Sequence, residues 1–195
     1  MDRNVFFERQ RFFDAPPGRP ASAPEQTLLR LLLASDGSTT RNCEAIAGVA
    51  PTIVVGRQEV TSEVPGLVRE LLHGEAFIER FSFLAARGQV MTDNLVYVAR
   101  DALPPDLRGA FNSCSIPVGH LLDTLWIRRV PVSKLAARPL FERLWTEVGQ
   151  PDPGAARAYT IITPDGPLFI IVETFRRGMR MGTGADGSAM VQDRS

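Results

Sequence analysis

The sequence contains few of the residues that build metal centres, disulfide frameworks or lysine-based anion sites. Only Cys43 and Cys114 are cysteine, and only His73 and His120 are histidine. Neither cysteine belongs to a CxxC pair, and neither histidine stands at i, i+4 spacing from another candidate ligand. We therefore expect reduced cysteines, no metal site and no cofactor. Lys134 is the one lysine, so an anion site would use arginine side chains or backbone amides.

The sequence also has a formal net charge of zero and no long apolar run. Twenty-two Lys and Arg balance 22 Asp and Glu, which removes the electrostatic case for a nucleic-acid or anionic-membrane partner. Charges interrupt the first residues before a signal segment develops, and no run approaches the roughly eighteen apolar residues of a membrane span. We expect a cytoplasmic enzyme or binding protein, monomeric or dimeric, whose partner is a small molecule.

Proline and glycine divide the 195 residues into one domain with two irregular ends. Four prolines between Asp14 and Pro24 mark residues 1–24 as an irregular lead-in. Residues 178–195 are glycine-rich and polar, which predicts a flexible tail. The tail glycines lack the strand-to-helix context of a phosphate cradle, and no P-loop, GxSxG or HExxH motif occurs. Residues 25–177 are left as the folded domain.

Helix and strand patterns alternate along this domain, and strands joined by hairpins outnumber helices. Expected helices start at Glu25, follow a Ser38 cap as far as Gly48, and cover 64–74, 106–113 and 138–148. The first has five leucines in six residues, so we expect it to be covered on most sides. Expected strands are 52–60, 77–85, 90–98, 125–132, 159–163 and 167–175. The pattern predicts an antiparallel α+β domain.

Two charged residues stand in strands that are otherwise apolar. Arg80 lies in FIERFSFL and Glu173 in PLFIIVETF. A guanidinium or carboxylate in a sheet interior needs a partner, so one interpretation is a structural ion pair, and another places both on outward positions. The functional interpretation is an arginine that binds a carboxylate and a glutamate that acts as an acid or hydrogen-bonding group in one cavity.

Four segments, taken in order, resemble the chorismate pyruvate-lyase family, whose members remove pyruvate from chorismate to leave 4-hydroxybenzoate. They are LLLASDGSTTR, FIERFSFLAARG, PVGHLL and GPLFIIVETF, and they extend from about Leu29 to Phe175. As in the family, Arg80 stands eight residues before the hairpin Gly88, and Glu173 stands seven after Gly166. The family's ubiquinone-pathway members carry a second arginine in the strand after the hairpin, where this chain has Leu95, and more distant members lack that arginine too.

The resemblance implies a six-stranded antiparallel sheet with helix-turn-helix flaps over a buried ligand. Arg80 would hold the ring carboxylate, and Glu173 would meet the ring hydroxyl. The backbone around Gly37, Ser38 and Thr39, together with Val118 and Gly119, would close the pocket. Thr39 has an equal alternative as a helix-capping residue. Gly37 is expected to adopt a conformation that other residues resist.

The implied reaction is a lyase step that needs no cofactor. Breaking the enol ether C–O bond and losing a ring hydrogen gives an aromatic ring, so positioning and water exclusion suffice. Leu95 removes one anion contact, and Asp93 would repel a dicarboxylate if it faced inward. An alternative is a non-catalytic domain that binds small aromatic acids, because the same fold serves transcription regulators, although only residues 1–24 precede the first expected helix. A further alternative is a biosynthetic enzyme that handles aryl acids by altered chemistry, in secondary metabolism.

Overall fold

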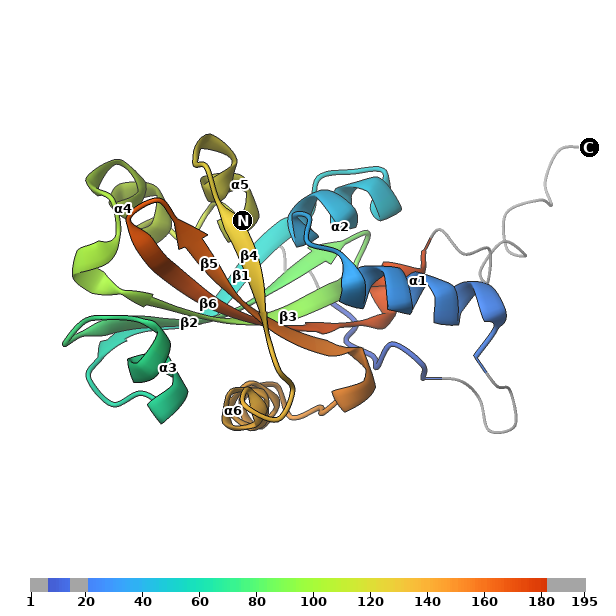
Figure 1. Ribbon diagram of the computed structural model, residues 1–195. Coiled ribbons are helices and arrows are strands. Elements are labelled where there is room, and N and C mark those ends of the chain that lie inside the picture. Colours follow the sequence, from blue (N-terminus) through green and yellow to red (C-terminus); the bar gives the residue numbers. More distant parts are fainter. Residues whose placement is uncertain (1–6, 15–20, 182–195) are drawn as a thin grey trace, which may run out of the picture.

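The computed structural model describes residues 7–14 and 21–181, and within them the protein forms one antiparallel sheet of six strands. Neighbouring strands follow the order β1-β2-β3-β6-β5-β4 (Figure 1). The strands are β1 (Thr52–Thr61), β2 (Phe77–Ala86), β3 (Gln89–Ala99), β4 (Arg128–Val132), β5 (Ala156–Thr163) and β6 (Gly166–Phe175). The predicted α+β class with a single antiparallel sheet is confirmed.

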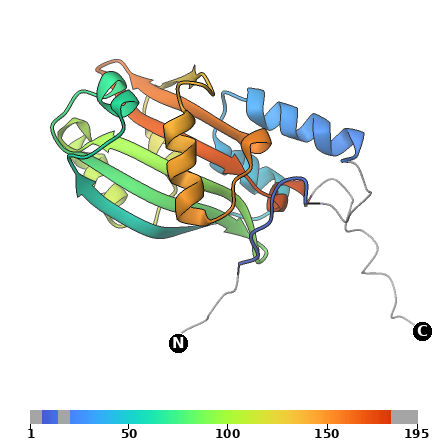
Figure 2. The same cartoon turned by 90° about the horizontal axis from the view of Figure 1, so that it is seen from below.

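Helices cover both faces of the sheet. The helices α2 (Thr39–Ala47), α4 (Pro105–Asn112) and α5 (Val118–Leu121) lie on the upper face in Figure 1, which we call the α2 face. The opposite α6 face carries α3 (Gly66–Leu71) and α6 (Arg138–Val148), and Figure 2 shows α6 crossing the strands. The longest helix, α1 (Ala23–Ala34), lies beside one end of the sheet, close to α2.

Alternation along the strands decides which face each side chain reaches. Because successive side chains point to opposite faces, β2 places Phe77, Glu79 and Phe81 on the α6 face. There Phe77 and Phe81 belong to one apolar cluster with residues of α6. The intervening Arg80 and Ser82 therefore lie on the α2 face, which brings them to the same side as Thr39 and the other residues of α2.

Two hairpins build most of the sheet, as predicted. β2 pairs with β3 through a turn in which Arg87 and Gly88 both have positive φ, 50° and 77°. β5 pairs with β6 through Gly166, whose φ is 119°. Glycine is the residue that tolerates such φ values at no steric cost. The two hairpins join where β3 pairs with β6.

Two expectations, one for α1 and one for the turn between α1 and α2, are wrong. Leu31 on α1 is 64% exposed, so α1 packs through one side that carries Leu29 and Leu32, whereas most sides were expected to be covered. The leucine run spans more of the helix circumference than the sheet end can cover. Gly37 does not adopt a positive φ; a Cβ there would lie 3.3 Å from the Ser35 hydroxyl oxygen. The turn between α1 and α2 is therefore open to other residues.

Both ends of the described chain pack onto the sheet. Phe12, in the lead-in, is completely buried with Phe175 and Met179. Met179 and Gly178 stand in the segment expected to be flexible, yet both are buried; residues 182–195 of that segment lie outside the described residues. In the described parts of the chain, no helix has the length and apolar character needed to cross a membrane.

Candidate functional site

A small cavity lies between the α2 face of the sheet and the helices α2 and α5. Its volume is about 40 Å³, which accommodates two or three water molecules but is far below the roughly 150 Å³ of a cavity that holds benzene. It is lined by Thr39, Thr40, Ile53, Ser82, Leu84, Asn94, Val96, Pro117, Val118, Gly119, Leu122, Arg129, Tyr159, Ile171 and Glu173. Every strand of the sheet contributes to this lining.

Glu173 is the carboxylate of the cavity, and three donors surround it. Arg157 Nε donates to Oε2 at 2.9 Å, the Thr39 hydroxyl donates to the same oxygen at 2.9 Å, and the Tyr159 hydroxyl donates to Oε1 at 2.9 Å. The Glu173 side chain is only 4% exposed. An ionised carboxylate accepts hydrogen bonds and donates none, so this arrangement accommodates the anion.

Arg157 ties the cavity to the first two helices. Its Nη1 donates to the carbonyls of Leu32, at 2.6 Å, and Ser35, while Nη2 donates to the Thr39 hydroxyl at 2.8 Å. The end of α1 and the beginning of α2 are therefore held by the same guanidinium that neutralises Glu173. Burial has the largest single effect on the pKa of Arg157 and lowers it, but the charges and hydrogen bonds of Glu173 and Tyr159 together outweigh burial and leave that pKa raised.

The pKa values of Tyr159 and Cys43, two groups near Glu173, are shifted further from neutral pH. Burial raises the pKa of Tyr159, and the adjacent Glu173 charge raises it further. Cys43, a buried residue of α2, also has a raised pKa, mainly through burial and secondly through Glu173. A thiol with a raised pKa is a poor nucleophile at neutral pH, so Cys43 acts here as a core residue.

Arg80 shares the α2 face with Glu173 but does not contact it. Its Nε donates to Gln58 Oε1 at 2.5 Å, its Nη2 donates to the Phe111 carbonyl, and its guanidinium lies 3.6 Å from the centre of the Phe111 ring. Arg80 is absent from the cavity lining. Burial lowers the pKa of Arg80 to about 10, so the guanidinium stays charged at neutral pH. The ion pair of Arg80 with Glu173, one of the interpretations, does not form.

The other predicted binding residues divide into two groups. Thr39, Val118 and Gly119 line the cavity, whereas Gly37 and Ser38 do not. Ser38 caps α2, its hydroxyl accepting from the Arg41 backbone N–H. Thr39 is the first residue of that helix, and its hydroxyl contacts Glu173.

Gly119 closes the cavity by letting α5 approach α2. A Cβ at Gly119 would lie 2.5 Å from Thr40 Oγ1 and 2.7 Å from Ser38 Oγ. Real Cβ atoms essentially never make contacts that short, so a side chain here requires the Thr40 and Ser38 side chains to turn away or the two helices to separate. Gly119 in this way sets the distance between the two segments that cover the cavity.

Sequence reasoning missed five polar groups of the site: Ser82, Asn94, Arg129, Arg157 and Tyr159. Three of them could have been found from the alternation of side chains along strands. Ser82 stands two positions from Arg80 and so lies on the same face. Arg157 and Tyr159 lie on one face of β5, where Arg157 pairs directly with Glu173 of β6. No local pattern pointed to Arg129, because β4 was the least regular of the expected strands.

The residue noted as a departure from the family does not face the cavity. Leu95 lies in the apolar cluster of the α6 face, and the cavity receives its neighbour Asn94. Asp93 is also on the α6 face, bound to Arg9 at 2.9 Å and to Arg176. A shift of the β2–β3 register between Leu84 and Ala85 sets this placement. Asp93 therefore does not repel a ligand in the cavity.

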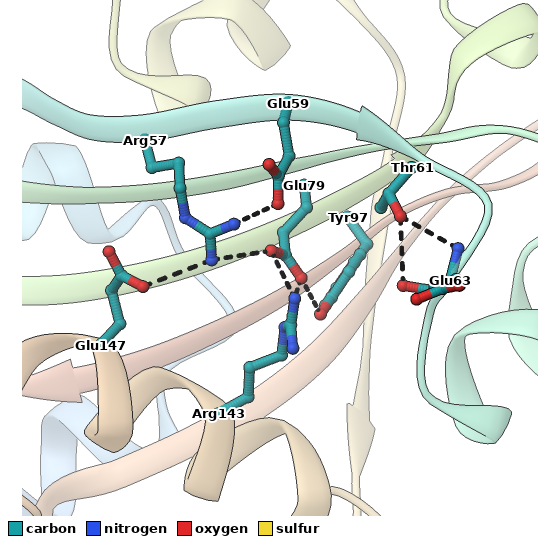
Figure 3. Close-up of polar contacts among 8 residues, drawn as sticks. All are labelled: Arg57, Glu59, Thr61, Glu63, Glu79, Tyr97, Arg143 and Glu147. Atoms are coloured by element: carbon teal, nitrogen blue, oxygen red, sulfur yellow. Dashed lines mark hydrogen bonds and ion pairs between the residues drawn. The ribbon is translucent and has the colours of Figure 1, made fainter.

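A second buried carboxylate, Glu79, lies on the α6 face (Figure 3). Arg143 of α6 donates to both of its oxygens, Tyr97 donates its hydroxyl, and Arg57 lies 3.1 Å away. Burial raises the pKa of Glu79, but the hydrogen bonds from Arg143 and Tyr97 and the two guanidinium charges lower it more, so the net pKa is below its ordinary value. Glu147 of α6 also pairs with Arg57. This cluster attaches α6 to the sheet.

Metal ligands are not gathered anywhere in residues 7–14 and 21–181. No group of three or more His, Cys, Asp or Glu side chains comes together there. The described side chains thus offer no ligand set to assign to a metal, and the absence of a cofactor stays a prediction.

Comparison with known proteins gives distant structural likenesses. No family model matches the sequence, and no curated protein does either. The chain is similar to the C-terminal domain of the histidine utilization repressor from Pseudomonas syringae, at 12% identity over 74% of this chain and 98% of that one, with a TM-score of 0.43. PhnF from Mycobacterium smegmatis gives 12% identity, 85% and 90% coverage and a TM-score of 0.44.

A third similar structure is a ligand-binding domain from Bordetella bronchiseptica, of a protein assigned to the GntR family of transcriptional regulators. Its identity is 14%, its coverage 64% of this chain and 85% of that one, and its TM-score 0.41. Likenesses this low carry no assignment of function. The resemblance to chorismate pyruvate-lyases accordingly stays a prediction drawn from sequence motifs.

Proposed function

We propose that the protein binds a small hydroxylated aromatic acid in the cavity beneath α2 and α5, as a binding domain. The observation that carries this proposal is a pair of polar side chains that line the cavity and have hydrogen-bonding capacity to spare. Ser82 and Asn94 are 7% and 8% exposed, yet within the described residues neither the Ser82 hydroxyl nor the Asn94 side-chain oxygen makes a hydrogen bond. Both oxygens can accept a hydrogen bond, and the Ser82 hydroxyl can also donate one, so a molecule in the cavity could bind to them.

The rest of the lining suits the flat body of such a molecule. Leu84, Val96 and Ile171 from the sheet, with Val118 and Leu122 from the opposite side, form apolar walls around the polar groups. Apolar walls with a few converging polar groups are typical of small-molecule sites. At about 40 Å³ the cavity holds no ring as it stands, so the proposal includes a separation of α5 from α2 when the ligand enters.

Titration calorimetry with 4-hydroxybenzoate tests this function. We expect saturable binding to the wild type and a loss of about tenfold or more in Asn94→Leu, because a leucine removes the amide and fills the cavity. Asn112→Leu, at the exposed end of α4, is the matched control and should bind as the wild type does. Equal affinities in all three proteins would place the ligand elsewhere, and absence of binding to the wild type would remove the proposal.

Lyase chemistry in the same cavity is a second candidate, and the arrangement around Glu173 favours it. A carboxylate flanked by the Tyr159 hydroxyl in an enclosed cavity can accept or return a proton. In the expected reaction the bond between the ring carbon and the enol oxygen breaks and the adjacent ring carbon loses its hydrogen as a proton. The released enolpyruvate takes up a proton at its methylene carbon to become pyruvate, so chorismate gives pyruvate and 4-hydroxybenzoate in equal amounts.

Release of pyruvate from chorismate separates the two candidates. A rate above spontaneous chorismate decay that falls in Glu173→Gln would favour the lyase. Binding of 4-hydroxybenzoate with no pyruvate above that decay would leave the binding function alone. Folding of the Glu173→Gln variant is checked by circular dichroism, because the variant deprives Arg157 of its anion.

A further inference from the structure

A second and much larger hollow, which we call the outer groove, opens between the end of α1 and strands β4 and β5. Its volume is about 430 Å³, within the range of roughly 300–1,000 Å³ that small-molecule sites occupy. It is lined by Leu33, Ala34, Ser35, Asp36, Arg129, Pro131, Val132, Lys134, Ala156, Arg157, Ala158 and Tyr159. Unlike the inner cavity, it accommodates an aromatic ring without movement of α2 or α5.

Arg129 and Tyr159 form the wall that the groove shares with the inner cavity. Arg129 Nη1 donates to the backbone carbonyl of Asp36 at 3.1 Å. Its Nε is buried and has no hydrogen-bond partner within the described residues, and no carboxylate among them forms a salt bridge with it. A buried donor without an acceptor costs free energy. The carboxylate of an anionic ligand could supply the acceptor that this nitrogen lacks.

The charges around the groove favour an anion. Arg129, Lys134 and Arg157 are its cations, and Asp36 is its one carboxylate. Arg157 is already neutralised by Glu173, which lies behind it at 2.9 Å. Lys134 is exposed and donates to the Pro153 carbonyl, which carries no charge. The groove therefore retains a net positive charge of one.

We propose that the outer groove is a second binding site, for an aromatic or other compact organic carboxylate. The carboxylate would accept a hydrogen bond from the Arg129 guanidinium, whose buried Nε would turn toward the groove when the ligand binds, and Lys134 would add longer-range attraction. The ring would lie against the apolar side chains of Leu33 and Pro131. This site goes beyond the proposed function, because its ligand needs a carboxylate but no hydroxyl and the groove is open as it stands.

Benzoate and its neutral counterpart benzamide are the probes for this site. We expect benzoate to bind saturably to the wild type, and benzamide to bind about tenfold more weakly or not at all, because it lacks the charge that Arg129 recognises. Equal binding of the two probes would overturn the proposal, and so would absence of saturable benzoate binding to the wild type.

Two pairs of variants locate the bound benzoate. Arg129→Gln should weaken it about tenfold or more, whereas the neighbouring Arg128→Gln, which alternates to the opposite face of β4, should leave it within about twofold. Ala34→Trp fills the groove from the exposed end of α1 and should block binding; Arg30→Trp, one turn earlier on the same helix and also exposed, should not. Retained affinity in a folded Arg129→Gln or Ala34→Trp variant would overturn the assignment.

The inner-cavity variant Asn94→Leu distinguishes this site from the proposed function. Benzoate affinity should be unchanged in Asn94→Leu while 4-hydroxybenzoate binding in the cavity is lost. If Asn94→Leu also abolished benzoate binding, the outer groove would carry no site and the cavity would account for both ligands. If 4-hydroxybenzoate failed to bind the cavity while benzoate still required Arg129, the groove would stand without the proposed function.

Discussion

At the scale of single residues, the arginines of the α2 face have different roles. Arg157 is paired with a carboxylate, whereas Arg80 and Arg129 bind neutral acceptors and each leave one buried nitrogen without a partner, Nη1 of Arg80 and Nε of Arg129. The three side chains have the same charge, and Arg129 differs from Arg80 in that it lines both the inner cavity and the outer groove, whereas Arg80 lines neither. Arg80 was singled out because it stands in an apolar strand, but that position does not show whether an arginine is structural or binds a ligand.

Arg80→Met tests whether Arg80 is structural. We expect the unfolding free energy to fall by about 1–3 kcal/mol, because Gln58 and the Phe111 carbonyl lose a buried donor. Affinity for 4-hydroxybenzoate should stay within about threefold, since Arg80 does not line the cavity. Urea denaturation and calorimetry measure the two quantities. Loss of binding at unchanged stability would instead show that Arg80 holds the ligand.

Arg157→Met should lower the unfolding free energy more strongly than Arg80→Met does. It leaves Glu173 buried without its cation, which costs about 3–5 kcal/mol, and it frees the Leu32 and Ser35 carbonyls. The control is Arg138→Met, whose salt bridge to Glu142 is largely exposed and contributes about 0.5 kcal/mol. Denaturation midpoints of the two variants that agree within error would show that Arg157 is dispensable to the fold.

Local patterns predicted the strands of the sheet well, but not the contacts of its polar residues. The hairpins at Gly88 and Gly166 and the caps of α2 follow from residues close in sequence, so they can be read from it. The pairing of Glu173 with Arg157 depends on β5 and β6 lying side by side, and that of Arg80 with Phe111 on the packing of α4. The irregular pairing near Leu84 decides that Asn94 faces the cavity and not Leu95. Such a shift leaves no mark in the hydrophobic pattern.

At the scale of elements, α5 and α2 behave as two parts of one cover over the cavity. Their contact is made through backbone and short side chains at Gly119, Thr40 and Ser38. Two apolar side chains of α5, Val118 and Leu121, anchor it in the core, and the helix has only four residues. A short helix with so few contacts is the natural place for local opening.

Gly119→Ala should push α5 away from α2. The added methyl would overlap Thr40 Oγ1, and such overpacking costs about 1–3 kcal/mol of unfolding free energy. Gly109→Ala in α4 is the control; no atom lies within 4 Å of its new Cβ, and it should be neutral or stabilising by up to about 1 kcal/mol. Thermal denaturation compares the two. A stabilised Gly119→Ala variant would contradict the close approach of the two helices.

The attachment of α6 through Glu79 predicts an acid-sensitive contribution to stability. The native pKa of Glu79 is lowered, so the unfolded chain, with its ordinary value near 4.5, binds the proton more tightly. The contribution is therefore fully present above that value and is lost as pH falls through the native pKa. Below the ordinary value, Glu79→Gln should show a flatter fall of unfolding free energy than the wild type. The control is Glu142→Gln, at an exposed position of α6, which should follow the wild-type curve. A Glu79→Gln curve that ran parallel to the wild-type curve would refute this assignment.

At the scale of the whole molecule, the segment before the first helix acts as part of the core. Phe12 is buried beside Phe175 and Met179, its N–H donates to Asp152 at 2.9 Å, and Arg9 binds Asp93. Residues 7–14 thus join the ends of β3 and β6 to the end of the described chain, an arrangement that the proline-rich stretch following them gives no reason to expect.

Phe12→Ala should lower the unfolding free energy by about 3–5 kcal/mol, because it empties a buried ring volume. The adjacent Phe13 is 36% exposed, so Phe13→Ala is the matched control and should cost about 1 kcal/mol or less. Guanidinium denaturation measures both. Equal and small effects would show that the N-terminal segment is not anchored in the core.

The two outermost strands have a consequence for how copies of the protein meet. β1 and β4 are the edges of the sheet, and unpaired edges invite strand pairing between molecules. β1 is interrupted by a bulge between Val55 and Arg57 around Gly56, and β4 is five residues long and contains Pro131, which has no N–H to donate. Both edges therefore resist extension of the sheet across two molecules, which guards the protein against edge-to-edge aggregation.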